Sequence, residues 1–292
     1  MSANPPLVVD KEADSLEGLS KSKMKIEPRK VGIDFSDIKS KTFYCDNPCI
    51  SAMWVGLSVS FPPGEAEFIK STRAFESRIT DDKLLEDVQK FSHQEAHHSL
   101  QHRLINKQFQ SLGYDVPSLD KFYKKELSKR AEQWSAEKRL ARTVVAEHVT
   151  AVMAHYALTQ EEKMSHFPAS LKALFQWHAI EEIEHKSVAF DVYRHCVDDR
   201  GLLMREYYYF VFFEFPFGIY MSTRFLLKEL GIKVTWQHRK QLFAYLFGKA
   251  GLISSVKSLY WMFKRKGFHP WDTDDSDLVE DWKQKLAPHF QH

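Results

Sequence analysis

The chain is poor in the features that mark several classes of protein. It has only three cysteines, Cys45, Cys49 and Cys196, among 292 residues, which argues against a disulfide framework and is typical of a reducing compartment such as the cytoplasm. Its formal net charge is only +2, so no bulk electrostatic case for nucleic-acid binding exists. Strand patterns are almost absent, and we find no repeat of fixed period and no glycine-rich phosphate loop. These absences favour a helical protein that binds no nucleic acid.

The N-terminal stretch lacks the basic start and apolar core of a signal peptide. Residues 1–40 are rich in Ser, Lys, Glu and Pro, and we expect them to form a flexible tail. Residues 41–292 are expected to form a single helical domain, with an apolar helical extension at about 202–270. Cys45 and Cys49 are spaced like half of a metal site, but no second pair of cysteines completes it.

The spacing of apolar residues predicts four main helices. The stretch NPCISAMWVGLSVSFPPGE is expected to be irregular, because Pro62-Pro63-Gly64 breaks it before a first helix at 65–79. The second helix should begin at Asp81 or Asp82 and end near Gly113. A charged connecting helix follows, then a third main helix at about 136–160. A fourth, continuous helix is expected from Pro168 to about Gly201.

The segment WHAIEEIEHK, residues 177–186, holds two histidines and three glutamates. Each residue of a helix turns by about 100°, so His178, Glu182 and His185 point in one direction. Glu181 is the main competitor of Glu182, since it also lies four residues from His185 on a compatible face.

The rest of the chain supplies matching partners. Glu95 and His98 are three residues apart, as are Glu182 and His185, so two Glu-x-x-His pairs are present. Glu147 stands among small and branched apolar residues, where an unpaired carboxylate is costly. Glu65 follows FPPG. Bundles that bind two metals use one Glu from each of two helices and a Glu-x-x-His from each of the others, which predicts a four-helix bundle with a di-metal centre.

Other acidic and imidazole groups are expected to have lesser roles. His102 and Glu181 are expected to support ligands by hydrogen bonding, although His102 remains open as a ligand. Glu67 and Glu76 compete with Glu65. For His93, His97 and His148 we expect surface or outer positions. Carboxylate and imidazole ligands favour two Fe ions, with Mn or a mixed Fe/Mn pair as options and Zn less favoured.

These motifs together resemble a known family. FPPGE, F-x-x-QE-x-x-H-x-x-x-H at Phe91–His102, AEHVTA, WHAIEEIEHKSVAFDVY and HPW at His269–Trp271 resemble the family of predicted metal-dependent hydrolases, over roughly 43–271. The His-x-x-x-Glu-x-x-His pattern is also similar to that of ferritin-like di-iron N-oxygenases such as p-aminobenzoate N-oxygenase. That likeness implies an all-α, ferritin-like bundle and oxygen chemistry. It implies metal ligands at Glu65, Glu95, His98, Glu147, His178, Glu182 and His185.

The last third of the chain is aromatic and basic. YYYFVFFEFPFGIYM is strongly apolar, but Glu214 and Pro216 interrupt it and it is short for a bilayer span. Between Gly201 and Pro270 eleven Lys or Arg stand against three Glu. Such a region either lies on an anionic membrane surface or covers the bundle and walls off a greasy pocket. A homodimer through this region is a further option.

Three functions remain in competition. The first is an O2-dependent di-iron oxygenase that acts on a hydrophobic small molecule or lipid-like substrate and takes electrons from an external donor. The second is a metal-dependent hydrolase in which two metals activate water. The third is a non-catalytic metal-binding protein. We expect a cytoplasmic protein, with peripheral contact to a membrane as an option.

Overall fold

The fold is described for residues 23–291 of a computed structural model. Helices dominate this part of the chain, and its strands are the short antiparallel pair β1 (Lys30–Val31) and β2 (Phe290–Gln291). The all-α prediction is therefore confirmed. The α-helices are α1 (Pro48–Arg73), α2 (Asp82–Ser111), α3 (Val116–Gln133), α4 (Ala136–Thr159), α5 (Glu161–Met164), α6 (Ala169–His185), α7 (Val188–Cys196), α8 (Arg200–Tyr209), α9 (Phe215–Glu229), α10 (Trp236–Phe247), α11 (Lys257–Met262) and α12 (Ser276–Leu286). The π-helical turn η2 (Phe210–Glu214) joins α8 to α9, and short 3-10 turns lie at Glu76–Arg78, Pro270–Asp272 and Ala287–His289.

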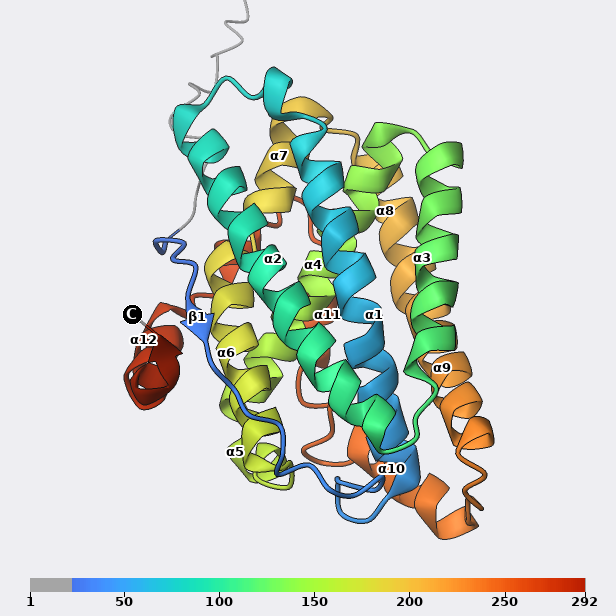
Figure 1. The fold of residues 1–292 in the computed structure, drawn as a ribbon. Helices are drawn as coiled ribbons and strands as arrows, with labels where there is room; N and C mark the ends of the chain where they lie inside the picture. The colour runs from blue at the N-terminus through green and yellow to red at the C-terminus, as the bar shows by residue number, and fades with distance from the viewer. Residues whose placement is uncertain (1–22, 292) are drawn as a thin grey trace, which may run out of the picture.

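Four long helices form the centre of the molecule (Figure 1). Helix α1 packs along α2, and α4 packs along α6, while α1 also contacts α4 and α2 contacts α6. Helix α3 lies outside this bundle against α1 and α2, and α8 and α9 cover α4 and α1 respectively. Each central helix therefore turns one face toward the other three and is flanked by further helices on the other side.

The predicted break at Pro62-Pro63 is wrong, because α1 runs through both prolines. A proline lacks the N–H that would bind the carbonyl four residues earlier, so Pro62 frees the carbonyl of Ser58. The side-chain Nδ2 of Asn106 on α2 donates to this carbonyl oxygen at 3.1 Å. Since the freed group finds a partner on the next helix, α1 continues and carries Glu65 well inside the bundle.

The predicted fourth helix is in fact two helices. Helix α6 ends at His185, and α7 begins at Val188. Lys186 lies at the break, and its side-chain Nζ binds Asp275 Oδ2 at 2.6 Å and the carbonyl oxygen of Thr273 at 2.8 Å. Because these partners come from the C-terminal part of the chain, the local sequence pattern does not predict the break.

The expectation of a flexible tail over 1–40 does not hold for its second half. Residues 23–40 cross the outside of the bundle beside α2 and α6 (Figure 1), and Ile26 and Ile38 are almost fully buried. The backbone N–H of Arg29 donates to Glu181 Oε1 at 2.8 Å. The part of the predicted tail before residue 23 lies outside the described residues.

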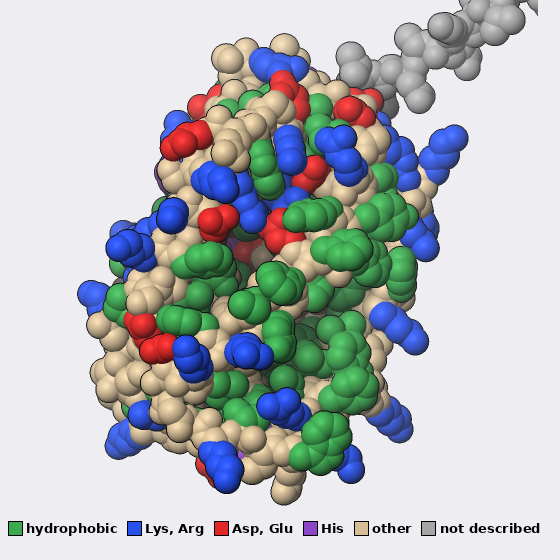
Figure 2. All heavy atoms as spheres, turned by 90° about the vertical axis from the view of Figure 1, so that its right-hand side faces the viewer, with side chains coloured by type: hydrophobic (Ala, Val, Ile, Leu, Met, Phe, Trp, Pro, Cys, Tyr) green, Lys and Arg blue, Asp and Glu red, His purple; other side chains and the backbone are tan. Residues whose placement is uncertain are grey.

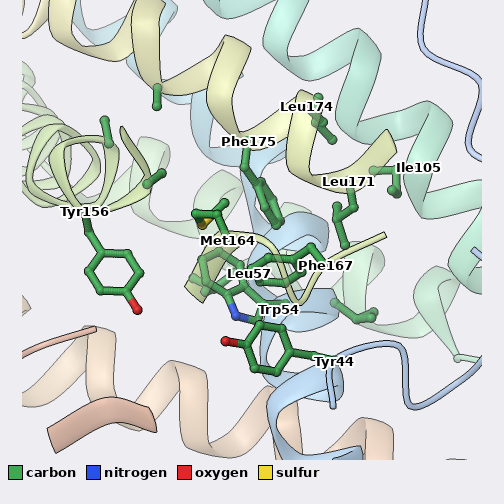
Figure 3. Packing of buried hydrophobic residues seen from close by; sticks show 14 of the residues in the cluster. Tyr44, Trp54, Leu57, Ile105, Tyr156, Met164, Phe167, Leu171, Leu174 and Phe175 are labelled. Atoms are coloured by element: carbon green, nitrogen blue, oxygen red, sulfur yellow. The ribbon is translucent and has the colours of Figure 1, made fainter. Parts of the chain in front are cut away.

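Aromatic side chains close one end of the bundle (Figure 3). Trp54 lies with its ring 4.7 Å from that of Phe175 and 5.3 Å from that of Phe167. Tyr44 stacks edge-on against Phe167, and Trp54 donates its indole N–H to Tyr245 on α10. A second apolar cluster, formed by Phe91, Val145, Val188 and their neighbours, fills the other half of the bundle. The polar side chains described next lie among these apolar groups and are closed off from water.

The C-terminal helices wrap the bundle. Helices α8, η2 and α9 form one continuous helical segment, Arg200–Glu229, which is long and apolar enough to cross a membrane by length and composition. The inner side of this segment packs against the bundle, since α8 contacts α4 and α9 contacts α1.

Candidate metal centre

Each of the four central helices points acidic or imidazole side chains at the middle of the bundle. Helix α1 supplies Glu65, α4 supplies Glu147, α2 supplies Glu95, His98 and His102, and α6 supplies His178, Glu182 and His185. All eight are buried, and none is more than 5% exposed. The positions predicted from sequence to hold a metal therefore meet in one place. Their role as ligands remains a prediction.

One end of the site is built around His185. Its Nε2 lies 3.2 Å from Glu95 Oε1, 3.4 Å from Glu147 Oε2 and 3.6 Å from Glu182 Oε2. Glu95, Glu147 and His185 bring one potential ligand atom each to within 4.8 Å of the others. The geometry at this end suits one metal ion held by two or three carboxylates and one imidazole.

The other end is built around His98 and His178. His98 Nδ1 lies 3.7 Å from Glu182 Oε1 and 4.0 Å from Glu95 Oε1, and His178 Nε2 lies 2.8 Å from Glu182 Oε1. Glu65 Oε1 is 3.9 Å from His178 Nε2. Glu95 and Glu182 thus face both ends, which is the arrangement expected of carboxylates that bridge two metals.

Many of the inward atoms have no hydrogen-bond partner. Buried atoms without a partner include Glu65 Oε1, both carboxylate oxygens of Glu95 and of Glu147, Glu182 Oε2, His98 Nδ1 and His185 Nε2. A buried polar atom without a partner costs about 1–3 kcal/mol, more when it is charged. Eight such atoms aimed at one centre would be a severe cost, and metal ions placed among them would give each atom a ligand bond. The residues present therefore fit a metal cofactor.

The ionisation of the site reflects this cost. Burial, added to repulsion from neighbouring glutamates, raises the pKa of Glu65 and of Glu95 well above the usual range. The same causes raise the pKa of Glu147 to about 7. Burial would raise the pKa of Glu182, but the neighbouring imidazoles of His178 and His185 outweigh it and lower this pKa. Burial lowers the pKa of His98. In the absence of metal, protons must therefore neutralise some of the carboxylates, and divalent cations would take their place.

The comparison with protein families agrees with this chemistry. A family model described as "Predicted metal-dependent hydrolase" matches residues 27–274. The chain belongs to this family. Searches of curated proteins and of solved structures gave no match. The resemblance seen in the sequence is thus confirmed, and the family description supports a metal-dependent enzyme. It agrees with the hydrolase alternative better than with the oxygenase expectation.

In this member of the predicted metal-dependent hydrolase family, the outer ring nitrogen of each inward histidine has a polar partner. His98 Nε2 lies 3.0 Å from Glu181 Oε2, and His185 Nδ1 lies 2.9 Å from Gln94 Oε1. His178 Nδ1 lies 3.0 Å from His102 Nε2. Such partners fix the orientation of a ligand and its tautomer. Glu181 and His102 contact the ligand candidates from behind, but His102 also forms a group of potential ligands with Glu65 and His178, so its supporting role stays a prediction.

His102 continues a chain of hydrogen bonds away from the centre. Its Nδ1 lies 2.9 Å from Ser58 Oγ, and Ser58 Oγ donates to Asn106 Oδ1 at 2.8 Å. If His178 presents the lone pair of Nε2 to a metal, its Nδ1–H donates to His102, whose Nδ1–H then donates to Ser58. Every group in the chain is then satisfied, which supports His102 as the partner of a ligand.

The competing acidic residues are engaged elsewhere. Glu67 forms a pair of hydrogen bonds with Arg139, and Glu76 binds Arg73 at the surface. His148 packs against Phe263 at a ring distance of 4.8 Å, outside the centre. The three cysteines are free, and none belongs to the groups of potential ligands in the described residues.

The sequence analysis did not identify the residues that form hydrogen bonds and ion pairs with the outer glutamates Glu181 and Glu184 and with Glu65. Arg29 binds Glu184 at 2.7 Å, and Gln94 Nε2 donates to Glu184 Oε2 at 2.9 Å. Ser99 donates to Glu65 Oε2 at 2.7 Å. Arg29 lies in a stretch whose composition predicts a flexible tail, so nothing in the sequence indicates that it contacts the site. Gln94 adjoins a ligand candidate, but its partner is on another helix.

Proposed function

We propose that the chain is a dinuclear metalloenzyme whose ions are held by Glu65, Glu95, His98, Glu147, His178, Glu182 and His185. The observation that carries the proposal is the convergence of buried ligand atoms that have no other partner. Two ions fit better than one, because the ligand groups fall at two ends with Glu95 and Glu182 between them. Charge agrees, since four carboxylates offer four negative charges and two divalent ions neutralise them.

The donor set favours iron or manganese. All seven proposed ligands are carboxylates or imidazoles, which suit these metals, whereas structural zinc sites are rich in thiolates and catalytic zinc sites use three protein ligands. The pairing of two Glu-x-x-His segments with two further glutamates in a helical bundle is the pattern of di-iron and di-manganese carboxylate proteins.

For the reaction, we favour O2-dependent oxidation of an apolar substrate. Bound iron would supply electrons to O2, with one oxygen atom entering the substrate, the other leaving as water, and two electrons and two protons coming from an external donor. The protein's own part is to hold the ions and exclude water. Aromatic rings lie against the ligand rings for this purpose, with Trp177 at 5.0 Å from His98, Phe91 at 4.9 Å from His185 and Phe61 at 5.1 Å from His178.

Hydrolysis is the second candidate, and the family description favours it. Two bound metals would lower the pKa of a water molecule and polarise the bond to be cleaved. The same ligands would serve, and the apolar surroundings would again select a hydrophobic ester or phosphate. The two candidates differ in whether the metal changes its oxidation state.

Metal analysis and oxygen dependence separate the candidates. Protein purified from iron-supplemented cells should contain about two Fe per chain, and ferrous protein exposed to air should develop a transient visible absorption band. The Glu147→Gln variant should lose the band, while Glu137→Gln, in the first turn of the same helix and away from the centre, should keep it. Zinc in the purified protein, with metal-dependent ester or phosphate cleavage that proceeds equally without O2, would overturn oxidation in favour of hydrolysis. Many irons per chain without turnover would overturn both.

A further inference from the structure

One face of the molecule carries a band of exposed aromatic side chains on α8, η2 and α9. Tyr209, Phe213, Phe217 and Tyr220 follow one another at helical spacing, and their exposed fractions range from 53% to 65%. Figure 2 shows apolar side chains gathered on this face, with Lys and Arg around them and a hollow beside the patch. Exposed apolar patches of this kind mark interaction sites, because leaving them in water is unfavourable.

The band is bounded by cations along the same helical stripe. Arg205 precedes Tyr209 by four residues, and Arg224 and Lys228 continue the stripe beyond Tyr220, all three exposed. A helix that lies flat in a bilayer interface buries its apolar stripe while basic side chains reach the headgroups.

The charge of the surrounding segment is mostly positive. Between residues 201 and 270 all eleven Lys and Arg side chains are exposed: Arg205, Arg224, Lys228, Lys233, Arg239, Lys240, Lys249, Lys257, Lys264, Arg265 and Lys266. Of the three glutamates in this region, Glu206 is buried and Glu229 is exposed. The positive surplus predicted by the sequence therefore lies on the surface.

The glutamates that interrupt the apolar run are used inside the protein. Glu214 binds Arg130 at 2.6 Å and also pairs with Arg142, and Glu206 pairs with Arg142 as well. These contacts join the π-helical turn to α3 and α4. They remove two negative charges from the outer face and anchor the aromatic band to the bundle.

We propose that this face docks on an anionic lipid bilayer. The aromatic band would enter the interface, and the surrounding lysines and arginines would bind anionic headgroups. The positive charge favours a lipid surface as the partner over a second copy of the chain. Two copies that met through this face would bring two positive surfaces together. Anchoring of α8 and α9 to α4 and α1 favours lying on the bilayer over crossing it. This inference is independent of the reaction at the metal centre.

Vesicle co-sedimentation tests the proposal with the full chain. Native protein should bind vesicles that contain phosphatidylglycerol, bind pure phosphatidylcholine weakly, and be released by high salt. The Arg224→Gln/Lys228→Gln variant should bind about twenty-five-fold more weakly, because each of the two cations near an anionic surface contributes about fivefold in affinity. The Phe213→Ser/Phe217→Ser variant should lose at least tenfold. Matched controls at exposed positions on α2, which carries no part of the aromatic band, are Leu100→Ser and Lys107→Gln, and both should bind like the native protein.

Four results would overturn the proposal. The proposal is refuted if the native protein does not bind vesicles that contain phosphatidylglycerol. It is also refuted if both interface variants bind these vesicles as the native protein does while their circular dichroism spectra show native helix content. Light scattering that shows a dimer dissolved by Phe213→Ser/Phe217→Ser would assign the face to a second copy. Retention on vesicles after alkaline carbonate extraction would instead indicate a spanning helix.

Discussion

Glu147 on α4 gives a test in which stability and metal binding change in opposite directions. Its carboxylate is 1% exposed and both its oxygens lack partners, and its pKa in the metal-free protein is raised to about 7. Glutamine has nearly the same shape but never ionises. We therefore expect Glu147→Gln to stabilise the metal-free protein and to weaken metal binding.

The size of the effect follows from linkage. A carboxyl whose pKa is 4.5 in the unfolded chain and about 7 in the folded protein lowers stability by about 3 kcal/mol at pH 7. The folded state binds this proton more tightly, so the native protein loses stability as the pH rises from 4.5 through 7. Glu147→Gln removes that loss. Its advantage should be small at pH 4.5 and reach about 3 kcal/mol at pH 7, of order 5–10 °C in Tm.

Thermal unfolding of chelator-treated protein measures the first half of the prediction. The second half repeats the measurement with ferrous or manganous ion under argon. A ligand at one hundred times its Kd stabilises the native protein by about 2.7 kcal/mol, and the variant should lose most of this gain. Glu137→Gln on the same helix should behave like the native protein in both conditions. A metal-free variant that is less stable than the native protein at pH 7, or one that keeps the full metal gain, would refute the reasoning.

The remaining predictions concern the neighbours of the centre. Glu182→Ala should lose at least one metal, whereas Glu181→Ala should keep two; elemental analysis decides, and the reverse result would mean that the register of α6 is wrong. Arg29→Met should weaken metal affinity about 10–100-fold in a chelator competition, because it releases the carboxylates that hold the ligands, and unchanged affinity would contradict that role. Asn106→Leu should cost about 1–3 kcal/mol in urea unfolding, since the carbonyl of Ser58 loses its partner, whereas native stability would show that water replaces it.

The prolines of α1 show where local rules stop. The pair at 62–63 predicts a break, and in an isolated helix the freed carbonyls would face water or remain unpaired. In the folded protein the carbonyl of Ser58 is paired, because Asn106, on another helix and far away in sequence, supplies a donor. Information on that partner is not contained in the local pattern. The same holds for the break after His185, where Lys186 turns toward Asp275.

Periodicity predicts which residues of the candidate site share a helix face. Residues three, four and seven apart share a helix face whatever the rest of the chain does, so His178, Glu182 and His185 had to point together. An ionisable side chain among apolar residues, such as Glu147, had to find compensation once buried. These two facts selected the inward residues before any contact was known.

The sequence by itself therefore determined the helical class, the two Glu-x-x-His segments and the faces on which the candidate ligands lie, because these depend on the geometry of single helices and on the cost of burying charge. Only the tertiary structure shows that Glu181 lies against His98, while Glu182 lies between His178 and His185. It also brings Arg29 and Gln94 to Glu184 and exposes the basic side chains of residues 201–270. These features depend on contacts between side chains of different helices, and such contacts cannot be read from the local sequence pattern.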